Sequence, residues 1–188
     1  AAYKVGSALL KVNADGKSFE EVWRDQRNLL THWSTAIHVD GFVYGFSGRH
    51  ENEGELRCIR VSDGEVVWKT SGFSGDLKMF RRNPNTKRIE NVETGETVPF
   101  PYFGRGSLIH IDGQFLVLGE RGTLAIVDVD PHEFHERGRF SMPEIHYPAW
   151  AAPVVSNGKL YLRSEDWLVC LDLQPRRKSA ASSSATTD

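Results

Sequence analysis

Two tryptophans and one arginine occupy the same place in a pattern that recurs three times along the chain. Trp33, Arg105 and Trp150 each stand just before an apolar strand, a two-residue turn and a second apolar strand. Aromatic rings and a guanidinium that converge from neighbouring repeats can stack on and pair with an anionic planar ligand. The alternative is that these side chains only plug a channel or pack on adjacent loops. Three neighbouring side chains share both interpretations: His32, His146 and Tyr147.

A basic segment over residues 78–88 is the second candidate for recognition. Its cations are interleaved with Met79 and Phe80, and three glutamates follow within residues 90–96. The cations are Lys78, Arg81, Arg82, Lys87 and Arg88. The segment is either a docking loop for an acidic partner or a self-neutralising surface loop. The formal net charge is −2 and no basic stripe continues elsewhere, so we expect no nucleic-acid partner.

No pattern of catalytic or metal-binding residues stands out. The sequence has no nucleophile elbow, phosphate-binding loop or zinc-ligand spacing. His132-x-x-His135 alone is too weak a pattern to predict a metal site. Cys58 and Cys170 fall at one register of the repeat, which favours small buried side chains over a disulfide or a reactive thiol. We therefore expect no catalytic residue and no metal ligand.

Three hairpins must position Trp33, Arg105 and Trp150. They turn at Asp40-Gly41, Asp112-Gly113 and Asn157-Gly158. Asp-Gly and Asn-Gly between alternating apolar runs predict a type I′ turn, which needs positive φ at both central residues. We expect Gly41, Gly113 and Gly158 to be structural residues for this reason.

Each hairpin leads into a third strand, and some repeats add a fourth. The third strands cover residues 56–61, 124–129 and 168–173. The fourth strand carries Trp68 and, in an earlier partial repeat, Trp23, and we expect both to be structural. Aromatic residues make up 11 % of the chain, glycines number 17, and no long segment has helical periodicity. Together these features predict an all-β chain, a β-propeller of four-stranded antiparallel blades with about three blades plus part of one.

The repeat also sets the expected boundaries. The predicted propeller part covers residues 1–173, with blade parts at about 3–25, 33–72, 104–140 and 146–173. Residues 74–103 interrupt the repeat, and their prolines and weak alternation indicate a long insertion loop with a small hairpin around Thr94-Gly95. Residues 174–188 are small and polar, so we expect a disordered tail.

The repeat resembles a known family. The pattern D-G-x-x-Y, then G-x-L-x-C/A-I/L-D/R-V/L, then D/T-G-E-x-x-W is similar to the pyrroloquinoline-quinone-type (PQQ-like) β-propeller repeat. Quinoprotein dehydrogenases and the propeller subunit of the outer-membrane barrel assembly machinery share this repeat. The resemblance implies a ring of six to eight blades, of which this chain would be the C-terminal half. It also implies that the closing Trp68 and, less closely, Trp23 pack between blades.

The resemblance is a weaker guide to activity than to fold. The dehydrogenases also use a vicinal cysteine pair and a calcium-binding carboxylate set, which we do not find in this sequence. No cofactor is evident from the residues, and PQQ is implied by the resemblance alone, with Trp33, Arg105 and Trp150 as its candidate contacts.

These observations predict a non-catalytic β-propeller scaffold that binds a protein or a ligand. One alternative is part of a PQQ-dependent quinoprotein oxidoreductase, and another is a docking subunit that uses the basic insertion. The expected partner is a protein or the missing N-terminal blades. No apolar run is long enough for a membrane span. The resemblance implies a periplasmic or otherwise exported location.

Overall fold

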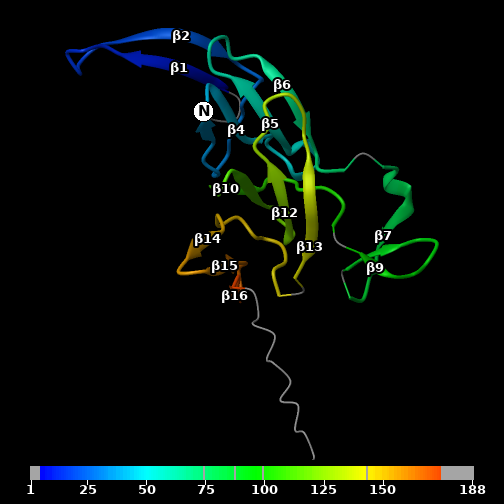
Figure 1. Cartoon of the computed structure of the whole chain (residues 1–188). Helices are drawn as coiled ribbons and strands as arrows, with labels where there is room; N and C mark the ends of the chain where they lie inside the picture. Colours follow the sequence, from blue (N-terminus) through cyan, green and yellow to red (C-terminus); the bar gives the residue numbers. More distant parts are fainter. Residues whose placement is uncertain (1–4, 74, 87, 99, 143, 175–188) are drawn as a thin grey trace, which may run out of the picture.

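The structure is a computed structural model that describes residues 5–73, 75–86, 88–98, 100–142 and 144–174. In this part of the chain the strands form five antiparallel sheets (Figure 1). Four of the sheets follow the sequence repeat, and the fifth belongs to the insertion. Two short 3-10 helices, η1 (Glu51–Glu53) and η2 (Leu77–Met79), complete the secondary structure.

The four repeat sheets have sequential strand order, which is the blade architecture of a β-propeller. The first sheet pairs β1 (Ser7–Val12) with β2 (Phe19–Asp25). The second contains β3 (Ile37–Val39), β4 (Phe42–Ser47), β5 (Glu55–Arg60) and β6 (Val66–Thr70). The third contains β10 (Ser107–Ile111), β11 (Gln114–Leu118), β12 (Thr123–Asp128) and β13 (Glu136–Ser141). The fourth contains β14 (Val154–Ser156), β15 (Lys159–Arg163) and β16 (Leu168–Asp172).

The predicted hairpin turns have the backbone that their residue types favour. At Asp40-Gly41 the φ angles are 45° and 84°, and the other two Asp-Gly and Asn-Gly pairs are similar, with φ between 48° and 75°. Positive φ at both central residues is the type I′ geometry, whose twist matches that of the flanking strands. In each turn the glycine is the residue with the larger positive φ.

The insertion has the expected small hairpin around Thr94-Gly95, but it contains more strand than the long loop that we expected. It folds into a three-stranded sheet of β7 (Phe80–Arg82), β8 (Ile89–Asn91) and β9 (Thr97–Val98), with the β8–β9 turn at Thr94-Gly95. The side chains of Asn83 and Asn91 accept backbone N–H bonds two and three residues ahead and so form the two tight turns. β7 was not expected, because a strand of three residues shows too few alternations to be recognised. Figure 1 shows this sheet standing to one side of the blades.

The core lies between neighbouring blades. Because side chains alternate along a strand, β11 contributes side chains to the core on both faces of its blade. Phe115 and Val117 pack toward the second blade, and Leu116 and Leu118 pack toward the fourth. The second blade contributes Tyr44, Phe46, Leu56 and Cys58 to the first of these clusters, and the fourth contributes Leu160 and Leu162 to the other. The chain is thus a series of stacked sheets.

The equivalent cysteines have different environments. Cys58 is buried against the third blade, as predicted, whereas Cys170 is exposed, which corrects the prediction for that residue. Val169 and Leu171 pack on the third blade, so the alternating positions Leu168 and Cys170 face the other way. No following blade of this chain covers them in the described residues.

The described residues include no helix that could cross a membrane.

Candidate interaction site

Trp33, Arg105 and Trp150 meet in the structure, although three different blades supply them. The ring centroids of the two tryptophans are 4.5 Å apart. The guanidinium carbon of Arg105 lies 4.9 Å from the centroid of the Trp33 ring and 5.5 Å from that of Trp150. Each residue precedes the first strand of its blade, where the loops of successive blades converge. The rings nevertheless remain accessible, with 40 % of Trp33 and 39 % of Trp150 exposed.

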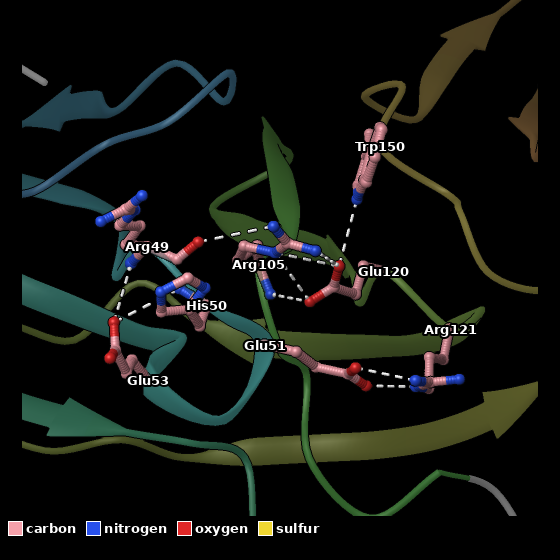
Figure 2. A network of polar contacts seen from close by, with 8 residues as sticks. All are labelled: Arg49, His50, Glu51, Glu53, Arg105, Glu120, Arg121 and Trp150. Atoms are coloured by element: carbon pink, nitrogen blue, oxygen red, sulfur yellow. Dashed lines mark hydrogen bonds and ion pairs between the residues drawn. The ribbon is translucent and has the colours of Figure 1, made fainter. Parts of the chain in front are cut away.

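Glu120 completes this cluster, and no motif in the sequence pointed to this residue. Its carboxylate is fully buried and accepts bonds from the Arg105 backbone N–H at 2.8 Å and from Nη2 at 2.7 Å. The indole N–H of Trp150 donates to the same carboxylate at 3.1 Å. Figure 2 shows Glu120 between Arg105 and Trp150, with dashed lines to both. The bond to Glu120 also raises the pKa of Arg105 above its ordinary value.

The hairpin register explains why Arg105 and Glu120 meet. Strands β10 and β11 pair from Ile111↔Gln114 to Ser107↔Leu118, and continuing this register two residues further places Arg105 opposite Glu120. Gly104 makes room for the carboxylate, because a Cβ there would lie 2.4 Å from Glu120 Oε1 and its φ is +64°. Counting outward from Asp112-Gly113 would therefore have found Glu120 in the sequence.

A neighbouring loop of the second blade supports the cluster. The Arg49 carbonyl accepts a bond from Arg105 Nη1 at 3.4 Å, and Glu53 accepts the backbone N–H groups of Arg49 and His50. In the same loop Glu51 is paired with Arg121 of the third blade, as Figure 2 shows. This bond raises the pKa of Arg121. The loop thus ties the second blade to the third directly beside the aromatic residues.

The flanking candidates lie around the tryptophan pair. His32 packs against Trp33 with 3.9 Å between centroids, and Tyr147 packs against Trp150 with 5.8 Å. Burial, followed by the charges of Arg105 and Arg49, lowers the pKa of His32. His32 is therefore held toward its neutral form. His146 is exposed, and its ring Nδ1 contacts the Tyr147 carbonyl at 3.2 Å.

This geometry does not fit a quinone carboxylate. An anionic cofactor at this position would need the guanidinium of Arg105, but the buried Glu120 already binds it through two nitrogens. The two indoles pack on each other and on Arg105. A ligand carboxylate at this position would have to compete with Glu120 for Arg105.

The cations of the basic segment lie in different surroundings. Arg81 is paired with Glu90, Nε to Oε2 at 3.4 Å, and Lys78 is exposed on η2. Arg82 and Arg88 line a cleft beside the third blade. Lys87 lies outside the described residues.

The two histidines of the His132-x-x-His135 spacing do not form a metal site. His135 Nδ1 contacts Asp128 Oδ2 at 2.5 Å, and Arg137 binds the same carboxylate. These bonds, that of Arg137 first, lower the pKa of Asp128 to about 2. Within the described part of the chain, no group of three or more His, Cys, Asp or Glu residues is arranged to hold a metal ion.

Two tryptophans join neighbouring blades by their indole N–H groups. Trp23 of β2 donates to the Val61 carbonyl at 2.6 Å, and Trp68 of β6 donates to the Asp130 carbonyl at 2.9 Å. Each acceptor lies in the turn after the third strand of the next blade. Trp23 also packs on Gly64, where a Cβ would lie 2.9 Å from the indole ring.

No protein-family model matches this chain, and no curated protein matches it in sequence. Among solved structures, BamB from Moraxella catarrhalis aligns with a TM-score of 0.50 and 15 % sequence identity, over 89 % of this chain and 38 % of that chain. The computationally designed proteins Ika8 and Ika4 align at 10 % and 11 % identity with TM-scores of 0.37 and 0.33. They cover 82 % and 78 % of this chain, and the alignments span 49 % and 96 % of theirs.

The chain thus spans well under half the length of BamB. The likeness to BamB shows a β-propeller fold, as the repeat predicts. Membership of the PQQ-like family stays a prediction.

Proposed function

We propose that this chain is a non-catalytic β-propeller scaffold that binds a protein partner through the aromatic face formed by Trp33, Trp150 and Tyr147. The observation that carries the proposal is the exposure of these rings: 40 %, 39 % and 42 % of the three residues face solvent. Large aromatic side chains are the residues that most often dominate protein–protein binding energy.

The aromatic face is also preorganised. Arg105 lies against both indoles, and the buried Glu120 holds Arg105 and the Trp150 N–H in place. A partner that binds such a face restricts the indoles little further, because contacts with Arg105 and Glu120 already hold them. The same pairing neutralises Arg105, which favours an apolar and aromatic contact over recognition of an anion.

The test compares partner recovery by variants of the aromatic face. Biotinylated wild-type chain, the Trp33→Ala/Trp150→Ala double variant and a Phe140→Ala control are incubated with extract of the source organism, and recovered proteins are quantified by mass spectrometry. Phe140 is an aromatic residue of β13 with the same 40 % exposure as Trp33, and it lies outside the aromatic face. We expect wild type and control to recover the same proteins, and the double variant to recover at least about tenfold less. Equal recovery by all three would contradict the proposal.

The non-catalytic part of the proposal has its own test. A protein containing all blades is incubated with PQQ and calcium and assayed for dye-linked dehydrogenase activity. We expect no turnover above the rate without protein, because Arg105 is already bound by Glu120. Saturable turnover would favour the quinoprotein alternative.

We extend the proposal to an exported location and to further blades as neighbours of this chain, as the family resemblance implies. Cell fractionation with an antibody against the chain tests the location. Recovery with the periplasmic or envelope fraction is expected, and recovery with cytoplasmic markers would contradict it.

A further inference from the structure

A cleft of about 530 Å³ lies between the insertion sheet and the third blade. Arg82, Ile89 and Val98 line it from the insertion sheet, and the chain that follows β13 lines it from the blade. Tyr147 belongs to the lining and also packs against Trp150. The cleft therefore borders the aromatic face described above.

The register of the insertion sheet decides which basic side chains enter the cleft. Arg82, Ile89 and Val98 are paired across β7, β8 and β9, so they share one face of the sheet. Arg81 and Glu90 form the neighbouring pair and belong to the other face. Adjacent arginines of one strand thus have different surroundings.

The lining is basic. The guanidiniums of Arg82 and Arg88 contribute to it together with the exposed His146, whereas the third lining guanidinium, that of Arg121, is already paired with Glu51. Among the described residues that line the cleft there is no aspartate or glutamate. Arginine forms strong bidentate hydrogen bonds with carboxylates, so this lining favours a ligand that carries them.

The rest of the lining favours a peptide. Ile89 and Phe100, which are both half-buried, provide apolar surface beside the cations. β9 is an edge strand of the insertion sheet, and its Thr97 and Val98 line the cleft. An extended segment that lies in the cleft, between the sheet and the blade, alternates its side chains between these two walls.

We propose that this cleft binds an acidic segment of the protein partner, in which carboxylates alternate with apolar side chains. The carboxylates bind Arg82 and Arg88 on the insertion side, and the apolar side chains pack on Phe100, which lies against Arg121 of the third blade, and on Met142. The inference rests on the proposed function, since the same partner would contact the aromatic face through Tyr147.

The probe is a fluorescein-labelled peptide that alternates glutamate with leucine. A control peptide carries glutamine in place of each glutamate. Binding to the whole chain is measured by fluorescence anisotropy. We expect saturable binding of the glutamate peptide, and binding at least about tenfold weaker in Arg82→Gln/Arg88→Gln. Arg81→Gln is the matched control from the opposite face of the same strand, and its affinity should stay within about twofold of wild type.

Equal affinity for the two peptides, no saturable binding, or an equal loss in the Arg81→Gln variant would overturn the cleft proposal. The partner recovery assay separates this failure from failure of the proposed function. If Trp33→Ala/Trp150→Ala loses the partner while the peptide does not bind, only the cleft proposal is wrong. If binding of the peptide depends on Arg82 and Arg88 while the tryptophan variant recovers the partner normally, the proposal for the aromatic face is wrong and the proposal for the cleft stands.

Discussion

Glu120 is the residue that gives the aromatic face its shape. A buried carboxylate is costly unless it is paired, and here Arg105 and the Trp150 indole supply its partners. Arg105 in turn holds both tryptophan rings beside its guanidinium. Arg105 is therefore a positioning residue of the proposed binding face, whereas its type and place in the sequence pointed to an anion ligand.

Glu120→Gln should destabilise the chain because Arg105 would lose its charged partner in a site where only 16 % of its side chain is exposed. Glutamine has nearly the same volume, so no cavity forms, and we expect a loss of about 3 kcal/mol in the free energy of unfolding. Urea unfolding measures this change. Glu21→Gln, which breaks the exposed pair with Arg24, should leave the midpoint nearly unchanged. A Glu120 variant as stable as this control would contradict the role of the pair.

The two cysteines should differ in reactivity although they are equivalent in sequence. Burial raises the pKa of Cys58 to about 11, which keeps its thiol protonated and inaccessible, whereas Cys170 is exposed. We expect a disulfide exchange reagent to modify one thiol of the folded chain quickly and the second only after unfolding. Cys170→Ser should abolish the fast phase, and a fast phase that persists in this variant would place the reactive thiol at Cys58.

At the level of elements, each blade is stabilised by the next one. Trp68 of β6 lies near Tyr44 and Phe134, with centroids 6.0 Å and 5.8 Å away, and donates its N–H to the Asp130 carbonyl. Trp23 makes the equivalent bond between the first and second blades. The third blade has no tryptophan at this place, and its contact with the fourth depends on Leu116, Leu118 and Leu124.

Trp68→Ala should weaken the contact between the second and third blades. Trp68 is half-buried, so we expect a loss of about 3 kcal/mol in the free energy of unfolding, near the lower end of the range for buried tryptophans. Chemical denaturation followed by circular dichroism measures this value. Trp167→Ala is the matched control, because 52 % of Trp167 is exposed, and it should change stability little. Similar losses in both variants would show that Trp68 has no special role between blades.

For the whole molecule, the two outermost sheets present apolar side chains to solvent. The β1–β2 hairpin exposes Val12 and Phe19, and the fourth blade exposes Leu168 on its outward face. Inner blades bury both of their faces, whereas the outermost sheets bury one. Exposed apolar sheet faces tend to associate with other chains or other blades.

The isolated 188-residue chain should therefore self-associate as its concentration rises. Leu168→Glu places a charge on a side chain that is 70 % exposed, so it should reduce association without changing the thermal midpoint. Sedimentation velocity over a range of concentrations measures the effect. A monomer at all concentrations, or unchanged association in the variant, would show that the fourth-blade face does not take part.

The predictions that succeeded depend on neighbours in sequence. An Asp-Gly or Asn-Gly pair sets its own turn, so the three hairpins and their strands could be located. The hairpin register also contains the pairing of Arg105 with Glu120, although we did not use it. In the insertion, the hairpin around Thr94-Gly95 was expected from its turn, but the pairing of β7 with β8 was missed because strands of two or three residues show too little alternation.

The sequence by itself determined the repeat, the all-β blades and the turns, because type I′ geometry and strand alternation are local properties. Only the tertiary structure decided that Trp33 and Trp150 meet over Arg105, that Cys58 is buried while Cys170 is not, and that Arg82 enters a cleft while Arg81 does not. Each of these outcomes depends on which blade or sheet lies opposite, and burial and electrostatic pairing arise only when those surfaces come together.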